Sequence, residues 1–400
     1  MSFTPKRLAV KLKPAAQRMV KKGHPWVFEG GITKLSAEGK AGDLAIIYDN
    51  KKNKFLACGF YDPHSPIRIK ILQVHQPAAI DETWLAQKVA TAKAKREPLL
   101  ATNTNSYRLL YGENDGLPSL VADVYAHVLV IKLYSAIWLP YVELLLPILQ
   151  QESQCSVAVL RLSRSLAPLA EKQGFADGQV LYGNLEEEVV VFREHGILFS
   201  ANVIHGHKTG YFLDHRHNRL KVGHLAKGKT LLDVFAYAGG FSVHALARGA
   251  TAVSSLDISA QALVMAQANA ALNAPTGSHE ILAVDAFKGL EELLKQGKSY
   301  DIVVIDPPSF AKKESEVAGA LHSYERLAAL GVRLVVPGGL LVLASCTARI
   351  SAQLFFDTVE PILHHSGRGI HIQEKTYHDV DHPIGFPEGA YLKCGYYKID

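Results

Sequence analysis

The stretch TLLDVFAYAGGFSVHAL, residues 230–246, opens a run in which short apolar segments alternate with helical patterns. Its first half is an apolar strand that contains Asp233, and the glycine pair Gly239 and Gly240 then leads into a helix. The same strand pattern returns at residues 252–257, 280–285, 301–306 and 339–346. Strands and helices that alternate in this way are typical of a doubly wound parallel sheet. The sequence therefore predicts an α/β, Rossmann-like fold here.

Successive strands of this run carry a carboxylate at or near their ends. These residues are Asp233, Asp257, Asp285 and Asp306. Ligands of a doubly wound sheet bind outside the carboxyl ends of its strands, and a buried acid is costly unless it meets a partner. The series predicts a ligand site at this edge of the sheet.

The residues around these acids favour a nucleoside-type cofactor. The glycine pair permits a tight turn and the close approach of a ligand, but the stretch lacks the G-x-G-x-x-G pattern of nicotinamide enzymes. Asp257 can accept both hydroxyls of a ribose, and Asp285 can accept from an exocyclic amine. We therefore expect S-adenosylmethionine. The predicted contacts in the sheet are Asp233, Phe235, Ala236, Tyr237, Gly239, Gly240, Asp257, Ile258, Asp285, Ala286 and Asp306.

The fifth strand of the run ends beside a thiol, Cys346, with Arg349 close behind. A thiolate that adds to C6 of cytosine makes C5 nucleophilic enough to accept a methyl group, and a carboxyl group at N3 assists. Asp306, in VVIDPPSF, is the candidate for that carboxyl group, and Arg349 is the candidate for lowering the pKa of the thiol. The alternative is that Cys346 is a buried structural thiol.

The chain before the sheet divides into further predicted regions. Residues 4–73 show short alternating strands, and residues 81–100 show the spacing of a helix capped by Asp81. A hairpin with a turn at Gly196 follows a mixed region. We predict a β-rich domain at residues 1–73, a linker helix with a central α+β domain at residues 74–190, and the lid hairpin with the sheet domain at residues 191–400.

Basic residues gather near the N-terminus, although the net charge is only +5. No acidic residue occurs before Glu29, and such clusters are typical of proteins that bind nucleic acid. A solvated surface is the alternative. The predicted RNA contacts in this segment are Lys21, Lys22, His24 and Trp26.

The segment SANVIHGHKTGYFLDHRHNR, residues 200–219, is interpreted as a lid. Lys208, Thr209 and Phe212 are expected near the adenosyl group, and Arg216 and Arg219, with Arg349 from the thiol segment, near RNA phosphate. The histidines of the segment invite a zinc interpretation, but no further residue completes a ligand set, so no metal is predicted.

The sequence shows no apolar run near the ~18 residues of a membrane span and no hydrophobic leader. Its four cysteines are scattered without a C-x-x-C pair. A reducing cytoplasm and no membrane partner are therefore expected.

With these motifs assembled, the sequence resembles the 23S ribosomal RNA large-subunit methyltransferase I family, which are cytosine-C5 methyltransferases dependent on S-adenosylmethionine. The resemblance covers essentially the whole chain. The segments that carry it are KKGHPWVFEGGI, YGENDGLPSLVADVY, HKTGYFLDHRHNR, DVFAYAGGFSVHA, DPPSF, SCT and HPIGFPEGAYLK. It implies an N-terminal PUA domain, ribosomal RNA as substrate, Cys346 as nucleophile, and a cofactor and base pocket lined by Asp257, Asp285 and Asp306.

The sequence departs from this pattern at two positions. Ser309 stands where the family often has lysine, and Thr347 stands where it often has serine. Ser309 also occupies the place of a second cysteine found in other RNA cytosine methyltransferases, so the group that removes the C5 proton is open.

Other functions compete with this interpretation. A methyltransferase of guanine or adenine amino groups would use the acid-proline-proline turn without a thiol, and a non-catalytic RNA-binding protein would bind no cofactor. A nicotinamide oxidoreductase is disfavoured because a phosphate loop is lacking. The sequence leaves the oligomeric state open, with a homodimer as one option.

Overall fold

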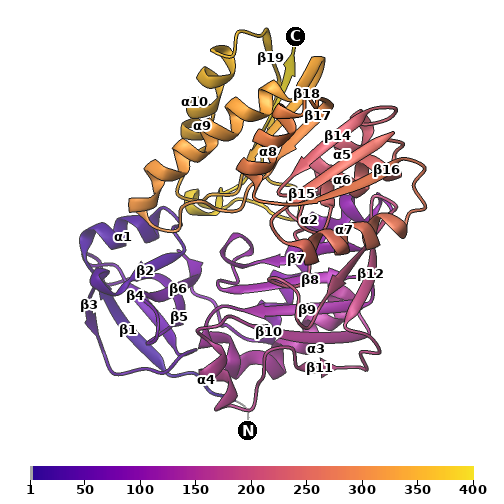
Figure 1. Cartoon of the computed structure of the whole chain (residues 1–400). Helices are drawn as coiled ribbons and strands as arrows, with labels where there is room; N and C mark the ends of the chain where they lie inside the picture. The colour runs from indigo at the N-terminus through magenta and orange to yellow at the C-terminus, as the bar shows by residue number, and fades with distance from the viewer. Residues whose placement is uncertain (1–2) are drawn as a thin grey trace. The chain divides into compact units, whose positions relative to one another are not determined.

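The computed structural model describes residues 3–400, which fall into two compact units (Figure 1). Unit 1 runs to Arg193 and includes two later segments, Ser200–Leu213 and Val380–Phe386. Unit 2 consists of Glu194–Phe199, Asp214–Asp379 and Pro387–Asp400. In the described part of the chain, no helix combines the length and the apolar character that a membrane span requires.

The first sheet of unit 1 has the strand order β2-β6-β5-β4-β1-β3. Its strands are β1 (Arg7–Leu12), β2 (Trp26–Phe28), β3 (Ile32–Leu35), β4 (Leu44–Tyr48), β5 (Phe55–Tyr61) and β6 (Ile67–Val74), and the short helix α1 spans Pro14–Lys21. Leu8, Val10 and Leu12 alternate with more exposed residues along β1 because successive side chains of a strand point to opposite faces. The predicted β-rich segment is confirmed.

The second sheet of unit 1 has the order β11-β10-β9-β8-β7. Its strands are β7 (Ser106–Tyr111), β8 (Leu120–Tyr125), β9 (Val128–Leu133), β10 (Val157–Leu162) and β11 (Val180–Tyr182). Helix α2 (Glu82–Leu100) begins after Asp81, whose side chain accepts a hydrogen bond from the Trp84 backbone N–H, as the sequence predicted.

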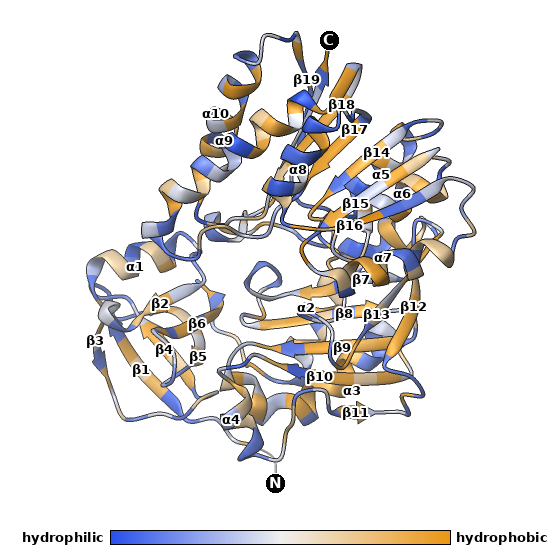
Figure 2. Ribbon diagram, viewed as in Figure 1, coloured by the Kyte–Doolittle hydropathy of each residue, from blue (hydrophilic) through white to orange (hydrophobic). Residues whose placement is uncertain are grey.

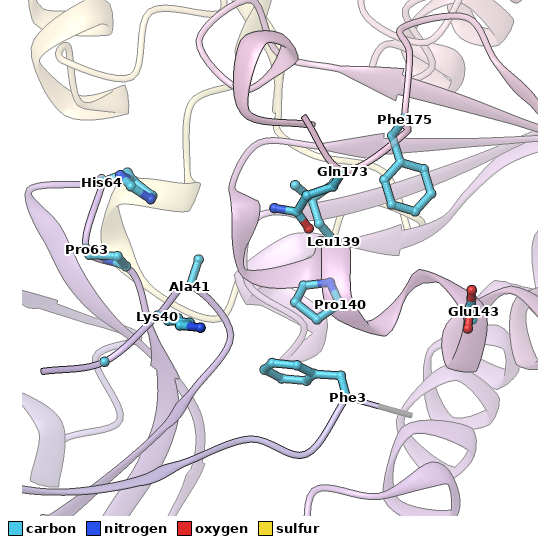
Figure 3. Close-up of a pocket in the computed structure, with 11 residues that line it drawn as sticks. Phe3, Lys40, Ala41, Pro63, His64, Leu139, Pro140, Glu143, Gln173 and Phe175 are labelled. Carbon is cyan, nitrogen blue, oxygen red and sulfur yellow. The ribbon is translucent and has the colours of Figure 1, made fainter. Parts of the chain in front are cut away.

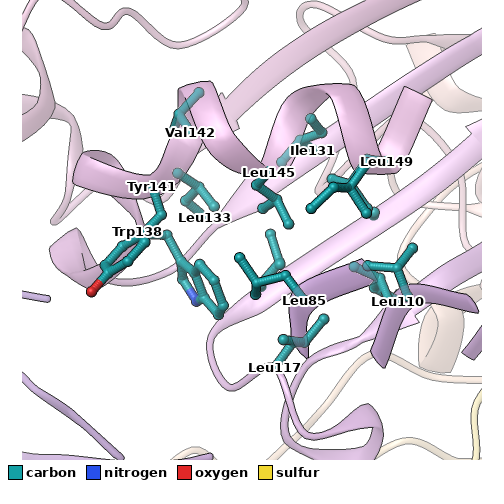
Figure 4. Close-up of a cluster of buried hydrophobic side chains, with 14 of the residues drawn as sticks. Leu85, Leu110, Leu117, Ile131, Leu133, Trp138, Tyr141, Val142, Leu145 and Leu149 are labelled. Atoms are coloured by element: carbon teal, nitrogen blue, oxygen red, sulfur yellow. The ribbon is translucent and has the colours of Figure 1, made fainter. Parts of the chain in front are cut away.

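One apolar core joins the parts of unit 1. Figure 4 shows Leu85 of α2 facing Leu145 and Leu149 of α3 (Val142–Ser153), with Trp138 beside them. Phe60 of the first sheet belongs to the same core, and its ring centroid lies 5.0 Å from that of Trp138. The boundary predicted at residue 73 therefore separates two sheets that lie within one compact unit.

The predicted hairpin is present as β12 (Val189–Glu194) and β13 (Ile197–Asn202). Both turn residues have positive φ angles, 50° at His195 and 82° at Gly196. Such a pair of angles is the mark of the tight turns that connect twisted antiparallel strands.

Unit 2 contains a sheet of seven strands in the order β16-β15-β14-β17-β18-β20-β19. The strands are β14 (Thr230–Val234), β15 (Ala252–Asp257), β16 (Ser278–Ala283), β17 (Tyr300–Ile305), β18 (Val335–Ser345), β19 (Ile370–Thr376) and β20 (Lys393–Ile399). The first five in this order pair in parallel, whereas β20 pairs antiparallel with both β18 and β19. The predicted doubly wound sheet is confirmed.

Helices precede and alternate with the parallel strands of this sheet along the chain. They are α5 (Arg216–Leu225), α6 (Gly240–Ala247), α7 (Ala260–Ala271), α8 (Ala286–Lys295), α9 (Val317–Arg333) and α10 (Ala352–His364). Figure 2 shows the apolar colouring along β14 and β17, which is expected for strands with helices on both faces. The strand order reverses between β14 and β17, and a crevice for ligands opens at the carboxyl ends of the strands next to such a reversal.

Candidate active site

The parallel strands of unit 2 bring the predicted acids and the thiol to one edge of the sheet. Asp233 lies in β14, Asp257 ends β15, and Asp306 directly follows β17. Cys346 directly follows β18, the neighbour of β17. Asp285 caps helix α8 just after β16. Segments more than a hundred residues apart thus meet where a doubly wound sheet binds its ligand.

Asp257 has the geometry expected of a ribose-binding carboxylate. Its Oδ2 accepts a hydrogen bond from the Tyr237 backbone N–H, and its Oδ1 accepts one from the Ser259 backbone N–H, both at 2.9 Å. These bonds fix the carboxylate and leave further lone pairs for ligand hydroxyls. The next side chain, Ile258, is 76% exposed and offers apolar surface for an adenine ring. This donor and acceptor set fits S-adenosylmethionine.

The turn after β14 contains residues in the left-handed backbone region. Phe235 and Tyr237 have φ angles of 66° and 47°, which non-glycine residues rarely adopt and which concentrate at functional sites. Gly239 has a φ of 79°, and a Cβ atom there would lie 2.8 Å from Cβ of Ala266 in α7. Gly239 is therefore required by packing as well as by the turn, a reason that the sequence did not reveal.

Two of the predicted cofactor acids also have local structural partners. Asp233 is buried, and its Oδ2 accepts hydrogen bonds from the backbone N–H and the hydroxyl of Ser242. Burial raises the pKa of Asp233 to about 7, against the lowering effect of these bonds. Asp285 accepts from the Lys288 backbone N–H. Asp233 thus ties β14 to α6, and its burial does not fit the direct cofactor contact that we expected.

Asp306 lies beside a histidine that the sequence placed only in the lid segment. His215 Nε2 is 3.3 Å from Asp306 Oδ1, and the Asp306 side chain is 25% exposed. Burial alone would lower the pKa of His215, but the negative charge of Asp306 outweighs it and the pKa is raised. The sequence offered no signal for this pair, because the residues are far apart in the chain.

Cys346 is partly exposed, and its Sγ lies 3.6 Å from the carbonyl oxygen of Pro307. A hydrogen bond connects the segments that follow β17 and β18, because the Phe310 N–H donates to Thr347 Oγ1 over 3.2 Å. Tyr324 of α9 hydrogen-bonds the same hydroxyl at 2.8 Å. Thr347 therefore supplies the hydroxyl of this junction, as a serine would.

The cation that is buried beside the thiol segment is Lys393, whereas the sequence pointed to Arg349. Lys393 Nζ donates to the carbonyl oxygens of Thr347 and Ile350, each over 2.6 Å. Burial lowers the pKa of Lys393 to about 8, and the charge of Cys346 acts in the opposite direction. The Arg349 side chain is 55% exposed, and its guanidinium lies 4.0 Å from Glu314. Solvent screens an exposed charge, so Arg349 is the weaker candidate.

Burial distinguishes Cys346 from the other cysteines. Cys58, Cys155 and Cys394 are buried. Burial raises the pKa of Cys58 to about 11 and also raises the pKa values of Cys155 and Cys394. A raised pKa and a closed environment make these thiols unreactive.

The structure corrects the RNA contacts expected for Arg216 and Arg219. Arg219 donates to both carboxylate oxygens of Glu194, at 2.8 and 2.7 Å. Arg216 Nη1 donates to Asp379 over 3.2 Å. Both side chains are buried, so they are not available to a phosphate in this arrangement. The polar sequence pattern did not show that acidic partners would enclose these arginines.

The lid residues predicted to contact the cofactor belong to unit 1. The hydroxyl of Thr209 is buried and donates to Asp123 over 2.6 Å. The ammonium of Lys208 lies 4.7 Å from the centroid of the Phe212 ring. Thr209 therefore has a structural role, and contacts of Lys208 and Phe212 with the adenosyl group stay predictions.

The N-terminal residues predicted to bind RNA divide into two groups. Lys21 and Lys22 are exposed, and Lys21 pairs with Asp49. His24 is buried, and the Trp26 indole donates to Glu113 over 3.0 Å and contacts the ring of Phe386. The two lysines can meet RNA, whereas His24 and Trp26 hold the first sheet against other parts of unit 1.

Within residues 3–400, no group of three or more histidine, cysteine or acidic side chains is arranged to hold a metal. A cavity of about 790 Å³ lies in unit 1. Figure 3 shows the residues that line it, and none of them is a predicted site residue.

Comparison with known proteins agrees with this geometry. Residues 111–387 match the family model of S-adenosylmethionine-dependent methyltransferases, and residues 10–73 match a PUA-like domain. A ribosomal RNA large subunit methyltransferase of Deinococcus radiodurans is 42% identical over 98% of each chain. The chain belongs to this methyltransferase family. The cofactor predicted from the sequence, S-adenosylmethionine, is confirmed, as is the PUA-like domain.

Two further proteins are similar to this chain over nearly its whole length. The ribosomal RNA large subunit methyltransferase I of Shewanella denitrificans is 34% identical over 96% of this chain and 98% of its own. A solved methyltransferase complexed with SAH has a TM-score of 0.82 at 21% identity, and covers 98% of this chain and 100% of its own. At that identity the likeness supports the fold alone.

Proposed function

We propose that this methyltransferase forms 5-methylcytosine in large-subunit ribosomal RNA, with Cys346 as the nucleophile and Asp306 as the carboxyl group at the base. The relatives described above are named for large-subunit ribosomal RNA. The observation that carries the proposal is that a partly exposed thiol and a partly exposed carboxylate directly follow the paired strands β18 and β17.

The chemistry needs a nucleophile that adds to the ring and a group that stabilises the adduct. S-adenosylmethionine supplies an electrophilic methyl group when bound. Cys346 Sγ attacks C6 of the cytosine, and the electron pair of the C5–C6 double bond makes C5 nucleophilic. Asp306 hydrogen-bonds or protonates N3 while the Sγ–C6 bond exists. After methylation at C5, a base takes the C5 proton, the C5–C6 double bond re-forms, and the Sγ–C6 bond breaks to return the thiolate.

The surroundings of Cys346 support its activation. Lys393 places a positive charge against the carbonyl groups of residues 347 and 350, immediately after the thiol. A nearby cation stabilises a thiolate relative to a thiol. The hydroxyls of Thr347 and Tyr324 fix the same segment, so the nucleophile is held on a rigid strand end.

Substrate binding extends the proposal to unit 1. The exposed basic residues of the PUA-like domain, Lys21 and Lys22 among them, would contact RNA phosphates through salt-dependent attraction. A target cytosine stacked in a helix would have to leave the stack before Cys346 could reach C6.

The decisive experiment compares Cys346→Ala with Cys394→Ala, which removes a buried thiol from the adjacent strand β20. Methyl transfer from labelled S-adenosylmethionine is measured on large-subunit RNA from cells that lack the gene, and bisulfite sequencing locates the product. Cys346→Ala should lose at least about 10³-fold in turnover with cofactor binding intact by calorimetry, whereas Cys394→Ala should stay within a few fold. Full turnover by Cys346→Ala, with the methyl group on an amino nitrogen, would favour amino-group methylation instead.

A further inference from the structure

His215 is a buried polar residue that has no role in the chemistry proposed above. Its side chain is only 6% exposed, and within residues 3–400 its Nε2 has no aligned hydrogen-bond partner. The atom nearest to it among the acids is Asp306 Oδ1 at 3.3 Å. A buried nitrogen without an aligned partner is costly, and this one lies 3.3 Å from the carboxylate that we place at N3 of the cytosine.

The other ring nitrogen of His215 fixes which tautomer is present. The Asn218 side-chain amide, at 3.0 Å, can only donate from its nitrogen, so His215 Nδ1 accepts. The amide is itself oriented, because its oxygen accepts from the hydroxyls of Thr376 and Tyr396 at 2.6 and 2.8 Å. The proton of the neutral imidazole therefore sits on Nε2, on the side of Asp306.

We propose that His215 is the positioning residue for Asp306, holding Oδ1 through its Nε2–H so that the rest of the carboxyl group meets N3 of the cytosine. This inference rests on the proposed function, which assigns Asp306 to the base. Hydrogen bonds between catalytic groups are commonly long without substrate and shorten in the complex. Closure of the 3.3 Å separation on substrate binding would satisfy the imidazole and fix the carboxyl group at once.

Among the charged neighbours of His215, Asp306 has the largest effect on its pKa, so the titration of His215 reports on Asp306. Asp214 and Asp306 raise the pKa of His215, whereas burial and the charge of Arg219 lower it. His217 is a further titratable neighbour, and the charge of His215 lowers its pKa. Nε2 carries a proton in both charge states of the ring, because the proton that titrates is the one at Nδ1, toward Asn218. The contact with Asp306 therefore persists across the titration.

The kinetic test compares His215→Gln, which keeps an N–H donor near the position of Nε2, with His215→Leu, which removes it. We expect His215→Leu to lower kcat by about 10²-fold, as a misplaced catalytic group does, and His215→Gln to recover most of that loss. KM for RNA and the Kd for S-adenosylmethionine should stay unchanged in both. Equal losses of kcat in the two variants would overturn the inference.

A second measurement does not depend on turnover or on the stability of the His215 variants. The pKa of His215 is read by NMR from its imidazole proton signal in the full-length protein and in Asp306→Asn. We expect a lower pKa in Asp306→Asn, because a charge that raises it is removed, and an unchanged pKa would overturn the inference. A shifted pKa together with no adduct between wild-type Cys346 and RNA would contradict the proposed function but not the contact between His215 and Asp306. The catalytic role of that contact would then be contradicted as well.

Discussion

Two buried histidines of unit 2 each pair with a carboxylate, and the two pairs differ in how completely the carboxylate is enclosed. His244 Nε2 lies 2.8 Å from Glu194 Oε1, both side chains are fully buried, and Arg219 binds the same carboxylate through two bonds. His215 lies 3.3 Å from Asp306, whose side chain is a quarter exposed. The Glu194 carboxylate is thus fully enclosed by protein, and we call it the closed carboxylate. The Asp306 carboxylate remains partly accessible where β17 and β18 end, and we call it the open carboxylate.

The pKa values of the two histidines shift in opposite directions, in line with this difference between the carboxylates. Burial lowers the pKa of His244 to about 4, although Glu194 acts against it, because the positive charge of Arg219 already balances the carboxylate. At His215 the charge of Asp306 prevails over burial and the pKa is raised. A carboxylate whose charge is already balanced serves structure, whereas one with an open side remains available for chemistry.

Replacing Glu194, the closed carboxylate, should have the largest effect, and that effect should be on stability. Glu194→Ala would leave Arg219 buried without its partner, so we expect the free energy of unfolding to fall by about 3–5 kcal/mol, measured by urea denaturation at neutral pH. Glu188→Ala is the control, because Glu188 pairs with His205 at an exposed site and should cost less than about 1 kcal/mol. Similar costs for the two variants would contradict the assignment of Glu194 to structure.

The contribution of Glu194 should also depend on pH in a defined direction. Its charged partners, Arg219 first, outweigh burial and hold its pKa well below the ordinary value of 4.5. Its stabilising effect is therefore fully present above pH 4.5 and is lost as the pH falls through its pKa in the folded protein. The difference in stability between wild type and Glu194→Ala should shrink in strong acid and stay constant between pH 6 and pH 8.

Removing the open carboxylate should affect activity rather than stability. We expect Asp306→Asn to lower kcat by about 10²–10³-fold, the usual range for a group that handles a proton, with the free energy of unfolding within about 1 kcal/mol of wild type. Asp301→Asn, at the other end of β17, is the control: its carboxylate accepts from Thr230, so it should lower stability and leave kcat unchanged. A large stability loss in Asp306→Asn with normal kcat would reverse the comparison.

The smallest expected effect is on the reactivity of the Cys346 thiol, and it distinguishes the contributions of Lys393 and Arg349. Alkylation of Cys346 by iodoacetamide at pH 7 should slow by about tenfold in Lys393→Met, which corresponds to a thiol pKa about one unit higher. In Arg349→Met the rate should change less than about twofold, because that guanidinium is exposed. Cofactor binding checks that each variant is folded. A larger decrease of the alkylation rate in Arg349→Met than in Lys393→Met would instead support Arg349 as the group that activates the thiol, as the sequence predicted.

The sequence predicted those parts of the fold that depend on local patterns. The alternating strands of the first sheet, the capped helix α2, the hairpin and the parallel strands of unit 2 were all predicted, because apolar periodicity and turn residues determine them. The short strands β2 and β3 were not, since three or four residues carry too little periodicity. The acids and Cys346 were found because each stands next to a strand end.

What the sequence did not reveal depends on contacts between distant segments. Arg216 and Arg219 appeared suited to phosphate, but Asp379 and Glu194 enclose them. Lys393, the first residue of β20, gave no local sign that its ammonium would bind the carbonyl groups after Cys346. The pairing of His215 with Asp306 likewise required the fold.

The most direct test of the chemistry traps the proposed adduct. Large-subunit RNA transcribed with 5-fluorocytidine is incubated with the enzyme and S-adenosylmethionine, and the cross-linked peptide is identified by mass spectrometry. A fluorine at C5 cannot leave as a proton does, so sulfur should remain bound to C6 and the modified peptide should contain Cys346. No covalent product, or attachment through another side chain, would show that methyl transfer here proceeds without this thiol.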